Sequence, residues 1–140
     1  MRRKVLLIGC NSLVGQSIVA GLHDNYQIIP TAGHHAPENG YQLMIEEPDK
    51  LVEVLTHENP EIVISSIRGS CQPQMVFHKT LADWLAGKEK RLLYISTANV
   101  FDGNLSRPWT EYDLPMPESD YGSFKRDCEA MLGKILENQL

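Results

Sequence analysis

The chain has 140 residues, of which 42% are hydrophobic and 22% are charged, a balance typical of one globular domain with its own core. The formal net charge of −5 excludes a broad basic surface for nucleic acid. The three widely spaced cysteines fit a reducing compartment better than a disulfide framework, and no apolar run is long enough to cross a bilayer. We therefore expect a single cytoplasmic domain, residues 1–140, with no nucleic-acid or membrane partner.

The first predicted element is a strand over residues 4–8, a branched apolar run that suits a strand buried on both faces of a parallel sheet. A turn containing Gly9 and Gly15 follows, and then an amphipathic helix that ends near residues 23–25. Strand, glycine turn and helix together predict a pyrophosphate site of a dinucleotide, because the helix N-terminus offers free N–H groups. The residues expected to contact this cofactor are Gly9, Asn11, Ser12, Leu13, Val14 and Gly15.

Ser12 occupies the position of the middle glycine in the usual Gly-x-x-Gly-x-x-Gly turn. Serine is small and can donate a hydrogen bond to a phosphate, so we expect the site to be kept. The alternative is a turn that only joins strand to helix.

A second strand is predicted over residues 26–31, followed by Ala32, Gly33, His34 and His35. An NAD site usually has an acidic residue here for the ribose 2′-hydroxyl, and this chain has none. Its absence favours NADP over NAD, with His34 or His35 near a 2′-phosphate. Adjacent histidines in a polar loop can equally be solvated.

The next segments alternate between strands and helices, which predicts a doubly wound, Rossmann-like α/β sheet. We expect short strands over residues 41–45, 61–66 and 91–95, and helices over residues 48–58 and 74–86. The fourth strand should end beside the glycine turn, where strand order reverses and ligands bind. This places Ser65, Ser66 and Ile67 at the cofactor crevice, and the fifth strand delivers Ser96 and Thr97 to the same edge.

Residues 100–119 are rich in Gly, Pro, Asn and Asp, and predict a long ordered loop before a last helix capped by Ser119 or Asp120. Tyr121 and Lys125 lie in the first turns of that helix, four residues apart and therefore on one face. A nearby cation favours phenolate over phenol, so the pair can exchange a proton with a carbonyl group under reduction. The alternative is an ordinary surface contact.

Several segments resemble the extended short-chain dehydrogenases, within them the dTDP-4-dehydrorhamnose reductase-like branch of sugar-nucleotide reductases. Members of this branch typically read ISTDYVFDG, then a Pro-aromatic-x-Glu-x-Asp-x-Pro-x-Pro loop, then YGxxKxxGE. The corresponding segments of this chain are YISTANVFDG, RPWTEYDLPMPESDYG and YGSFKRDCE, with GCNSLVG at the amino terminus.

The resemblance implies roles for individual residues. Thr97 would orient the substrate carbonyl, Tyr121 would be the catalytic acid, and Lys125 would hold the nicotinamide ribose and lower the pKa of the tyrosine. Ser96 would support them. The implied reaction is hydride transfer from NADP or NAD to a keto-sugar nucleotide.

Departures from the family pattern all touch the cofactor groove. Ala98 and Asn99 replace an acidic residue and a tyrosine, and the Asn-Ala-Ala stretch reads Ser65-Ser66-Ile67-Arg68. The Leu-Asp-Ile-Thr-Asp segment reads Leu43-Met44-Ile45-Glu46-Glu47. The resemblance also covers only the cofactor half of the family fold, which implies a truncated fold without the region that closes over the sugar.

Two functions follow from the resemblance. The chain is either a reductase of a keto-sugar nucleotide, or its cofactor-binding half, or a non-catalytic nucleotide-binding member similar to the regulatory subunit of methionine adenosyltransferase. In both cases similar proteins dimerise, and we expect a homodimer formed through the helices at 74–86 and 121–137.

Overall fold

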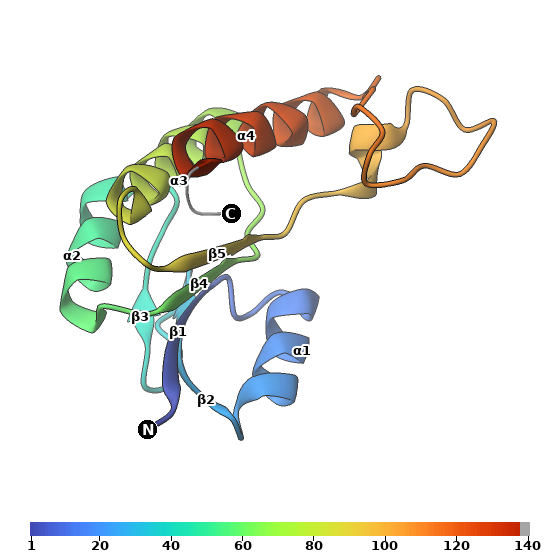
Figure 1. The fold of residues 1–140 in the computed structure, drawn as a ribbon. Coiled ribbons are helices and arrows are strands. Elements are labelled where there is room, and N and C mark those ends of the chain that lie inside the picture. The colour runs from blue at the N-terminus through green and yellow to red at the C-terminus, as the bar shows by residue number, and fades with distance from the viewer. Residues whose placement is uncertain (138–140) are drawn as a thin grey trace.

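The computed structural model describes residues 1–137, which form a five-stranded parallel sheet of order β3-β2-β1-β4-β5 with helices on both faces (Figure 1). The elements in chain order are β1 (Arg3–Ile8), α1 (Leu13–Leu22), β2 (Tyr26–Ala32), β3 (Tyr41–Gln42), α2 (Pro48–Glu58), β4 (Ile62–Ser65), α3 (Cys71–Leu85), β5 (Arg91–Tyr94), the 3-10 helix η1 (Ala98–Phe101) and α4 (Asp120–Leu136). The predicted doubly wound α/β sheet is confirmed. Strand order reverses between β1 and β4, where ligands bind in such sheets.

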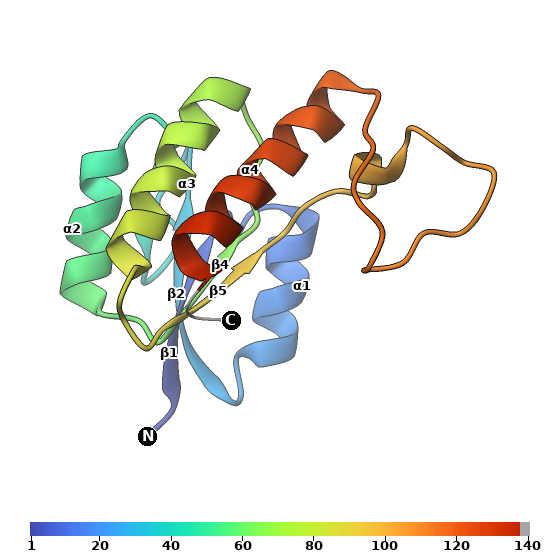
Figure 2. The same ribbon diagram turned by 45° about the horizontal axis from the view of Figure 1, so that its top comes forward.

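Helices α2, α3 and α4 cover one face of the sheet, and α1 lies alone on the other (Figure 2). Successive side chains of a strand point to opposite faces, so β1 contributes to both cores. Leu6 and Ile8 pack with the three-helix layer, whereas Val5 and Leu7 pack on the α1 side. All four are at most 1% exposed, which confirms the prediction of a strand buried on both faces.

Helix α2 follows the sequence pattern closely. Pro48 stands at its first position, and its buried residues are Leu51, Val54 and Leu55. Asn59 ends it in the left-handed conformation, with φ of 48°, and Pro60 cannot continue a helix.

Most boundaries shift by one or two residues from the sequence analysis, and three differences have a clear local cause. The strand expected over residues 41–45 ends at Gln42, because Met44 and Glu47 close a turn in which the Glu47 N–H donates to the Met44 carbonyl at 3.0 Å. The helix expected from residue 74 begins at Cys71, since proline at 73 lies in the first turn, where its missing N–H costs no helical bond. The loop expected from residue 100 contains the end of η1, whose Val100 is buried.

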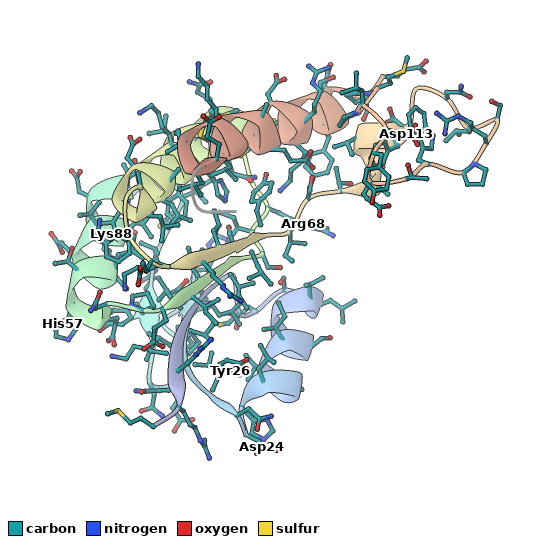
Figure 3. The ribbon with its side chains drawn as sticks, in the orientation of Figure 1. Asp24, Tyr26, His57, Arg68, Lys88 and Asp113 are labelled. Carbon is teal, nitrogen blue, oxygen red and sulfur yellow. The ribbon has the colours of Figure 1, made fainter. Side chains whose placement is uncertain are left out.

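The loop between η1 and α4, which contains Asp113, projects from the body of the domain (Figure 1, Figure 3). Hydrogen bonds from backbone N–H groups close the loop at its base. The Gly103 N–H donates to the Met116 carbonyl at 2.8 Å, and the Glu118 N–H donates to the Asp102 carboxylate at 2.5 Å. Within the loop, Arg107 pairs with Asp113 at 3.0 Å. These bonds order the loop internally.

Among residues 1–137, none of the helices combines the length and the apolar character that a membrane crossing needs.

Candidate functional site

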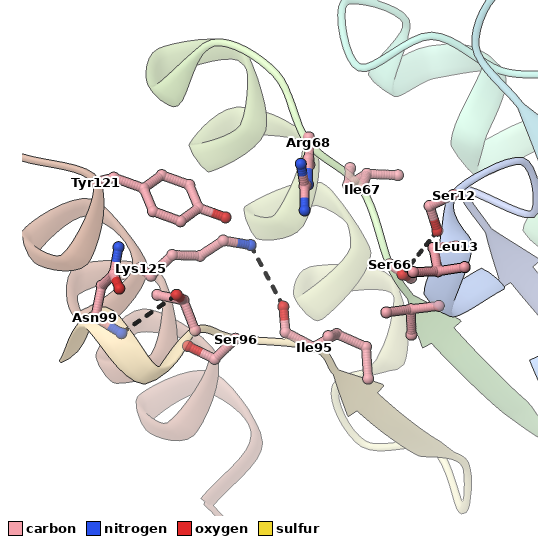
Figure 4. Close-up of a pocket in the computed structure, with 12 residues that line it drawn as sticks. Ser12, Leu13, Ser66, Ile67, Arg68, Ile95, Ser96, Asn99, Tyr121 and Lys125 are labelled. Atoms are coloured by element: carbon pink, nitrogen blue, oxygen red, sulfur yellow. Dashed lines mark hydrogen bonds between the residues drawn. The ribbon is translucent and has the colours of Figure 1, made fainter. Parts of the chain in front are cut away.

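A cavity of about 770 Å³ opens at the carboxyl edge of the sheet, between the N-terminus of α1 and the first turns of α4 (Figure 4). Parallel strands bring their carboxyl ends to this edge, so residues far apart in sequence meet there. The lining residues are Ser12, Leu13, Val14, Ser66, Ile67, Arg68, Ile95, Ser96, Thr97, Asn99, Tyr121 and Lys125.

The glycine turn that forms one wall is closely packed. Gly9 has a φ of +88°, and a Cβ there would lie 2.1 Å from the Ser66 carbonyl oxygen. A Cβ on Gly15 would lie 2.2 Å from the Gly9 carbonyl oxygen. The tight turn and the close approach of helix to strand are therefore confirmed, and both require glycine.

Ser12 lines the cavity and also ties the glycine turn together. Its hydroxyl accepts a hydrogen bond from the Gly15 N–H at 2.9 Å and so caps α1. Its single proton is used within the protein, by the Gly9 carbonyl at 3.0 Å or by Ser66 Oγ at 3.2 Å. In the structure this hydroxyl bonds within the turn, and its donation to a phosphate stays a prediction.

The end of β5 supplies two hydroxyl groups to the opposite wall. Thr97 caps η1, because its Oγ1 accepts from the Asn99 N–H at 3.3 Å. Ser96 Oγ donates to the Glu129 carboxylate on α4, which ties the strand end to the helix. Thr97 keeps its hydroxyl proton, since it acts only as an acceptor in this bond.

The first turns of α4 place Tyr121 and Lys125 in the cavity (Figure 4). Ser119 caps the helix by accepting from the Gly122 N–H at 3.0 Å. The Lys125 Nζ lies 5.9 Å from the centre of the Tyr121 ring and 4.7 Å from the centre of the Tyr94 ring. Thr97, Tyr121 and Lys125 thus face one space.

Lys125 is a buried amine, with 2% of its surface exposed. Its Nζ donates to the Ile95 carbonyl at 3.4 Å. Burial lowers the pKa of the Lys125 ammonium, the cation of Arg68 lowers it further, and Glu129 on the next turn opposes them. The amine therefore has a weak neutral acceptor and no direct ionic partner among residues 1–137.

Most residues expected at the site line the cavity; four of them do not, and neither do the two histidines considered for a 2′-phosphate. Gly9 and Gly15 shape the turn behind it, and Asn11 is exposed beside it. Ser65 points into the core, where its Oγ lies 2.8 Å from Nε2 of the buried His78. His34 and His35 are exposed on the loop after β2, away from the lining.

Three lining residues have no binding or catalytic role in the sequence analysis: Arg68, Ile95 and Asn99. Of these, Arg68 and Asn99 are named there only as departures from the family pattern that touch the cofactor groove. Arg68 belongs to the segment after β4 that is expected beside the glycine turn, and that position was the available signal for a binding role. Ile95 and Asn99 flank the predicted Ser96 and Thr97. Their exposure to the cavity depends on how the chain turns after β5, which no motif specifies.

The family described as the RmlD substrate binding domain matches residues 70–140, a segment that contains Thr97, Tyr121 and Lys125. Among curated proteins, the beta subunit of methionine adenosyltransferase 2 of Rattus norvegicus is 27% identical over 99% of this chain and 44% of its own length. The dTDP-4-dehydrorhamnose reductase of Burkholderia thailandensis is 25% identical over 87% of this chain and 43% of its own.

Solved structures show the same fold. The dTDP-4-dehydrorhamnose reductase of Bacillus anthracis, in complex with NADP, superposes with a TM-score of 0.79 at 21% identity, over 96% of this chain and 50% of that one. The chain thus spans about half the length of the proteins it matches.

Proposed function

The chain belongs to the RmlD substrate binding domain family, and on that premise we propose that it binds a nicotinamide dinucleotide and reduces a keto-sugar nucleotide, alone or as the cofactor-binding half of a larger reductase. One observation carries the proposal. Thr97, Tyr121 and Lys125 lie in the same cavity as the N-terminus of α1.

The residues present fit a dinucleotide. Gly9 and Gly15 carry no side chain at the two points of the turn where a Cβ would clash with backbone atoms. Leu13 and Val14 bring the first turn of α1 to the cavity, and the positive end of the helix dipole favours a phosphate. The volume of about 770 Å³ falls within the usual range for cofactor sites.

When bound, the dinucleotide supplies a hydride to the carbonyl carbon of the sugar. Tyr121 donates its phenolic proton to the carbonyl oxygen as that oxygen gains negative charge. The positive charge of the nearby Lys125 ammonium stabilises the Tyr121 phenolate that remains. Thr97 donates its free hydroxyl proton to the same oxygen and so orients the carbonyl group.

We further propose that NADPH binds at least as tightly as NADH. The end of β2 and the loop after it carry Ala32, Gly33, His34 and His35, and no carboxylate among them selects the ribose 2′-hydroxyl of NAD.

Titration with NADPH and with NADH, followed by nicotinamide fluorescence, tests cofactor binding. We expect saturable binding by the wild type and a loss of about tenfold or more for Lys125→Met, which removes a buried charge-assisted contact. Lys79→Met is the matched control, because Lys79 is exposed on α3 and pairs with Asp83. Binding of neither dinucleotide by the folded wild type contradicts the proposal.

Tyr121→Phe separates binding from chemistry. Tyr121 is 38% exposed, so this variant should fold and bind NADPH like the wild type while losing reduction of a keto-sugar nucleotide. Equal turnover by both proteins would remove Tyr121 from the reaction.

The similarity to the methionine adenosyltransferase beta subunit, over 99% of this chain, favours a second function. In that case the chain binds dinucleotide without turnover and serves as a subunit of another enzyme. Dinucleotide binding, no reduction of any keto-sugar nucleotide and co-purification with a methionine adenosyltransferase would together favour this alternative.

We also propose a cytoplasmic homodimer that pairs α3 and α4, one domain per chain. These helices lie side by side in the outer layer, and Val76 of α3 is 47% exposed. The cysteines at positions 10, 71 and 128 are free thiols, in keeping with a reducing compartment. Sedimentation that shows only monomer at high concentration would exclude the dimer.

A further inference from the structure

We propose that Arg68 is a cofactor-binding residue whose guanidinium contacts the diphosphate of the dinucleotide. The inference rests on the proposed function and adds to it a residue that the glycine turn does not supply. Arg68 follows Ser66 and Ile67 directly after β4, at the carboxyl edge of the sheet.

The segment that carries Arg68 is held against the glycine turn. Ser66 Oγ lies 3.2 Å from the hydroxyl of Ser12, the cap of α1. The side chain of Ile67 lies so near Gly9 that a Cβ there would approach its Cγ2 to 2.9 Å. Arg68 comes next in the chain, and its position relative to the turn is therefore fixed from one side.

The other side of the segment is held by α3. The buried Gln74 donates from Nε2 to the Gly69 carbonyl at 2.9 Å. Gly69 has a φ of +142°, in the region that favours glycine, and Ser70 is the first flanking residue of α3. A loop braced at both ends fixes the position of its backbone, and with it the point from which the exposed Arg68 side chain starts. A fixed backbone reduces the entropy lost when a ligand binds.

The guanidinium points into the cavity, between Ser12 on α1 and the Tyr121–Lys125 pair on α4 (Figure 4). Figure 3 shows the same residue near the end of β5, and its side chain is exposed. A dinucleotide that runs from the helix N-terminus toward the amine passes this point. The part that leaves the helix N-terminus is its diphosphate.

The net positive charge of the cavity lining favours an anionic ligand. Its lining contains two cations, Arg68 and Lys125, and no carboxylate, in a chain of formal net charge −5. Within residues 1–137 no ion pair or hydrogen bond occupies the Arg68 guanidinium. A diphosphate would accept parallel hydrogen bonds from the guanidinium and offset its repulsion of Lys125.

The test is titration of wild type, Arg68→Gln and Arg91→Gln with NADPH and with NADH. Arg91 is exposed at the start of β5, at the amino ends of the strands and away from the cavity, and its replacement removes the same charge. We expect Arg68→Gln to weaken both dinucleotides by about tenfold or more, and by the same factor, because they share the diphosphate. Arg91→Gln should bind both like the wild type.

Different failures have different meanings. No dinucleotide binding by the wild type overturns the proposed function itself. Wild-type binding with an Arg68→Gln affinity within twofold overturns only the role of Arg68. A loss confined to NADPH would assign Arg68 to the 2′-phosphate, and a loss confined to a nucleotide sugar such as dTDP-glucose would assign it to the substrate; either result overturns the diphosphate contact. Equal melting temperatures of the three proteins verify that the variants fold.

Discussion

The two faces of the sheet are built in different ways. On the three-helix side, Phe77 and Leu81 of α3 and Leu51 of α2 are completely buried against the strands. On the other side, Gly15 is the only buried residue of α1. An apolar groove of about 610 Å³ runs between α1 and β5 there, and Leu93 on its wall remains 48% exposed.

The difference separates what holds the domain together from what shapes its site. Side-chain volume buried by α2, α3 and α4 supplies most of the apolar burial and hence of the stability. On the α1 side, the backbone of the helix packs directly against the backbone at the end of β1, and glycine makes this close contact possible. The cavity lies between the two sides of the sheet: Ser12 comes from the α1 side, and Tyr121 and Lys125 come from the three-helix side.

The largest expected effect is on the three-helix side. Phe77→Ala removes a completely buried ring and should lower the free energy of unfolding by about 3–5 kcal/mol, through lost transfer energy and the cavity left behind. Leu93→Ala, on the half-covered face, should cost less than about 1 kcal/mol. Urea unfolding measures both. Similar losses would mean that the two faces do not differ in stability.

The second effect is a pH dependence of the free energy of unfolding, and it arises from His78 on the three-helix side. Burial lowers the pKa of His78 to about 4, and the neutral ring is satisfied by the Gln74 carbonyl and the Ser65 hydroxyl, each at 2.8 Å. Between pH 6.5 and 4 the unfolded chain therefore binds a proton that the folded chain does not. The free energy of unfolding should fall as the pH falls through this window, by about 3 kcal/mol in total.

His78→Gln should remove this part of the pH dependence, since glutamine does not titrate. His57→Gln is the control, because His57 is exposed near the end of α2 and should leave the profile unchanged. Unfolding measured in urea at several pH values between 4 and 7 compares the slopes. An unaltered slope in His78→Gln would assign the acid sensitivity to other groups.

The smallest effect concerns the α1 side. Gly15→Ala places a methyl group against the Gly9 carbonyl and should cost about 1–3 kcal/mol through the backbone shift it forces. Gly21→Ala lies in the same helix, where a Cβ meets nothing within 4 Å, and should stabilise by up to about 1 kcal/mol. Thermal melting compares the two. Opposite signs would show that α1 depends on close backbone contact at one point only.

Periodic segments could be predicted from the sequence, and irregular ones could not. The buried stripe of α2 and the cap at Ser119 follow from local rules of spacing and capping. η1 spans four residues, too few for any hydrophobic period. The start of α3 was missed because Pro73 resembles a boundary when it is in fact a first-turn residue.

The same reasoning explains the site. Thr97, Tyr121 and Lys125 could be placed because each follows a predicted strand end or helix start. Ser65 and Ser66 could not be told apart, because a strand that is apolar on both faces carries no alternation to fix which hydroxyl turns toward the core. The position of Arg68 depends on the contact of Ile67 with Gly9 and on the bond from Gln74 to Gly69, which no sequence motif specifies.

The closed base of the projecting loop makes it an interchangeable unit. Because Asp102 and Gly103 are joined to Glu118 and Met116 at its neck, the segment between them can be shortened, lengthened or exchanged for another without displacing Ser119 or the phenol of Tyr121. New recognition could be grafted onto this tip while the proton-transferring residues stay where they are.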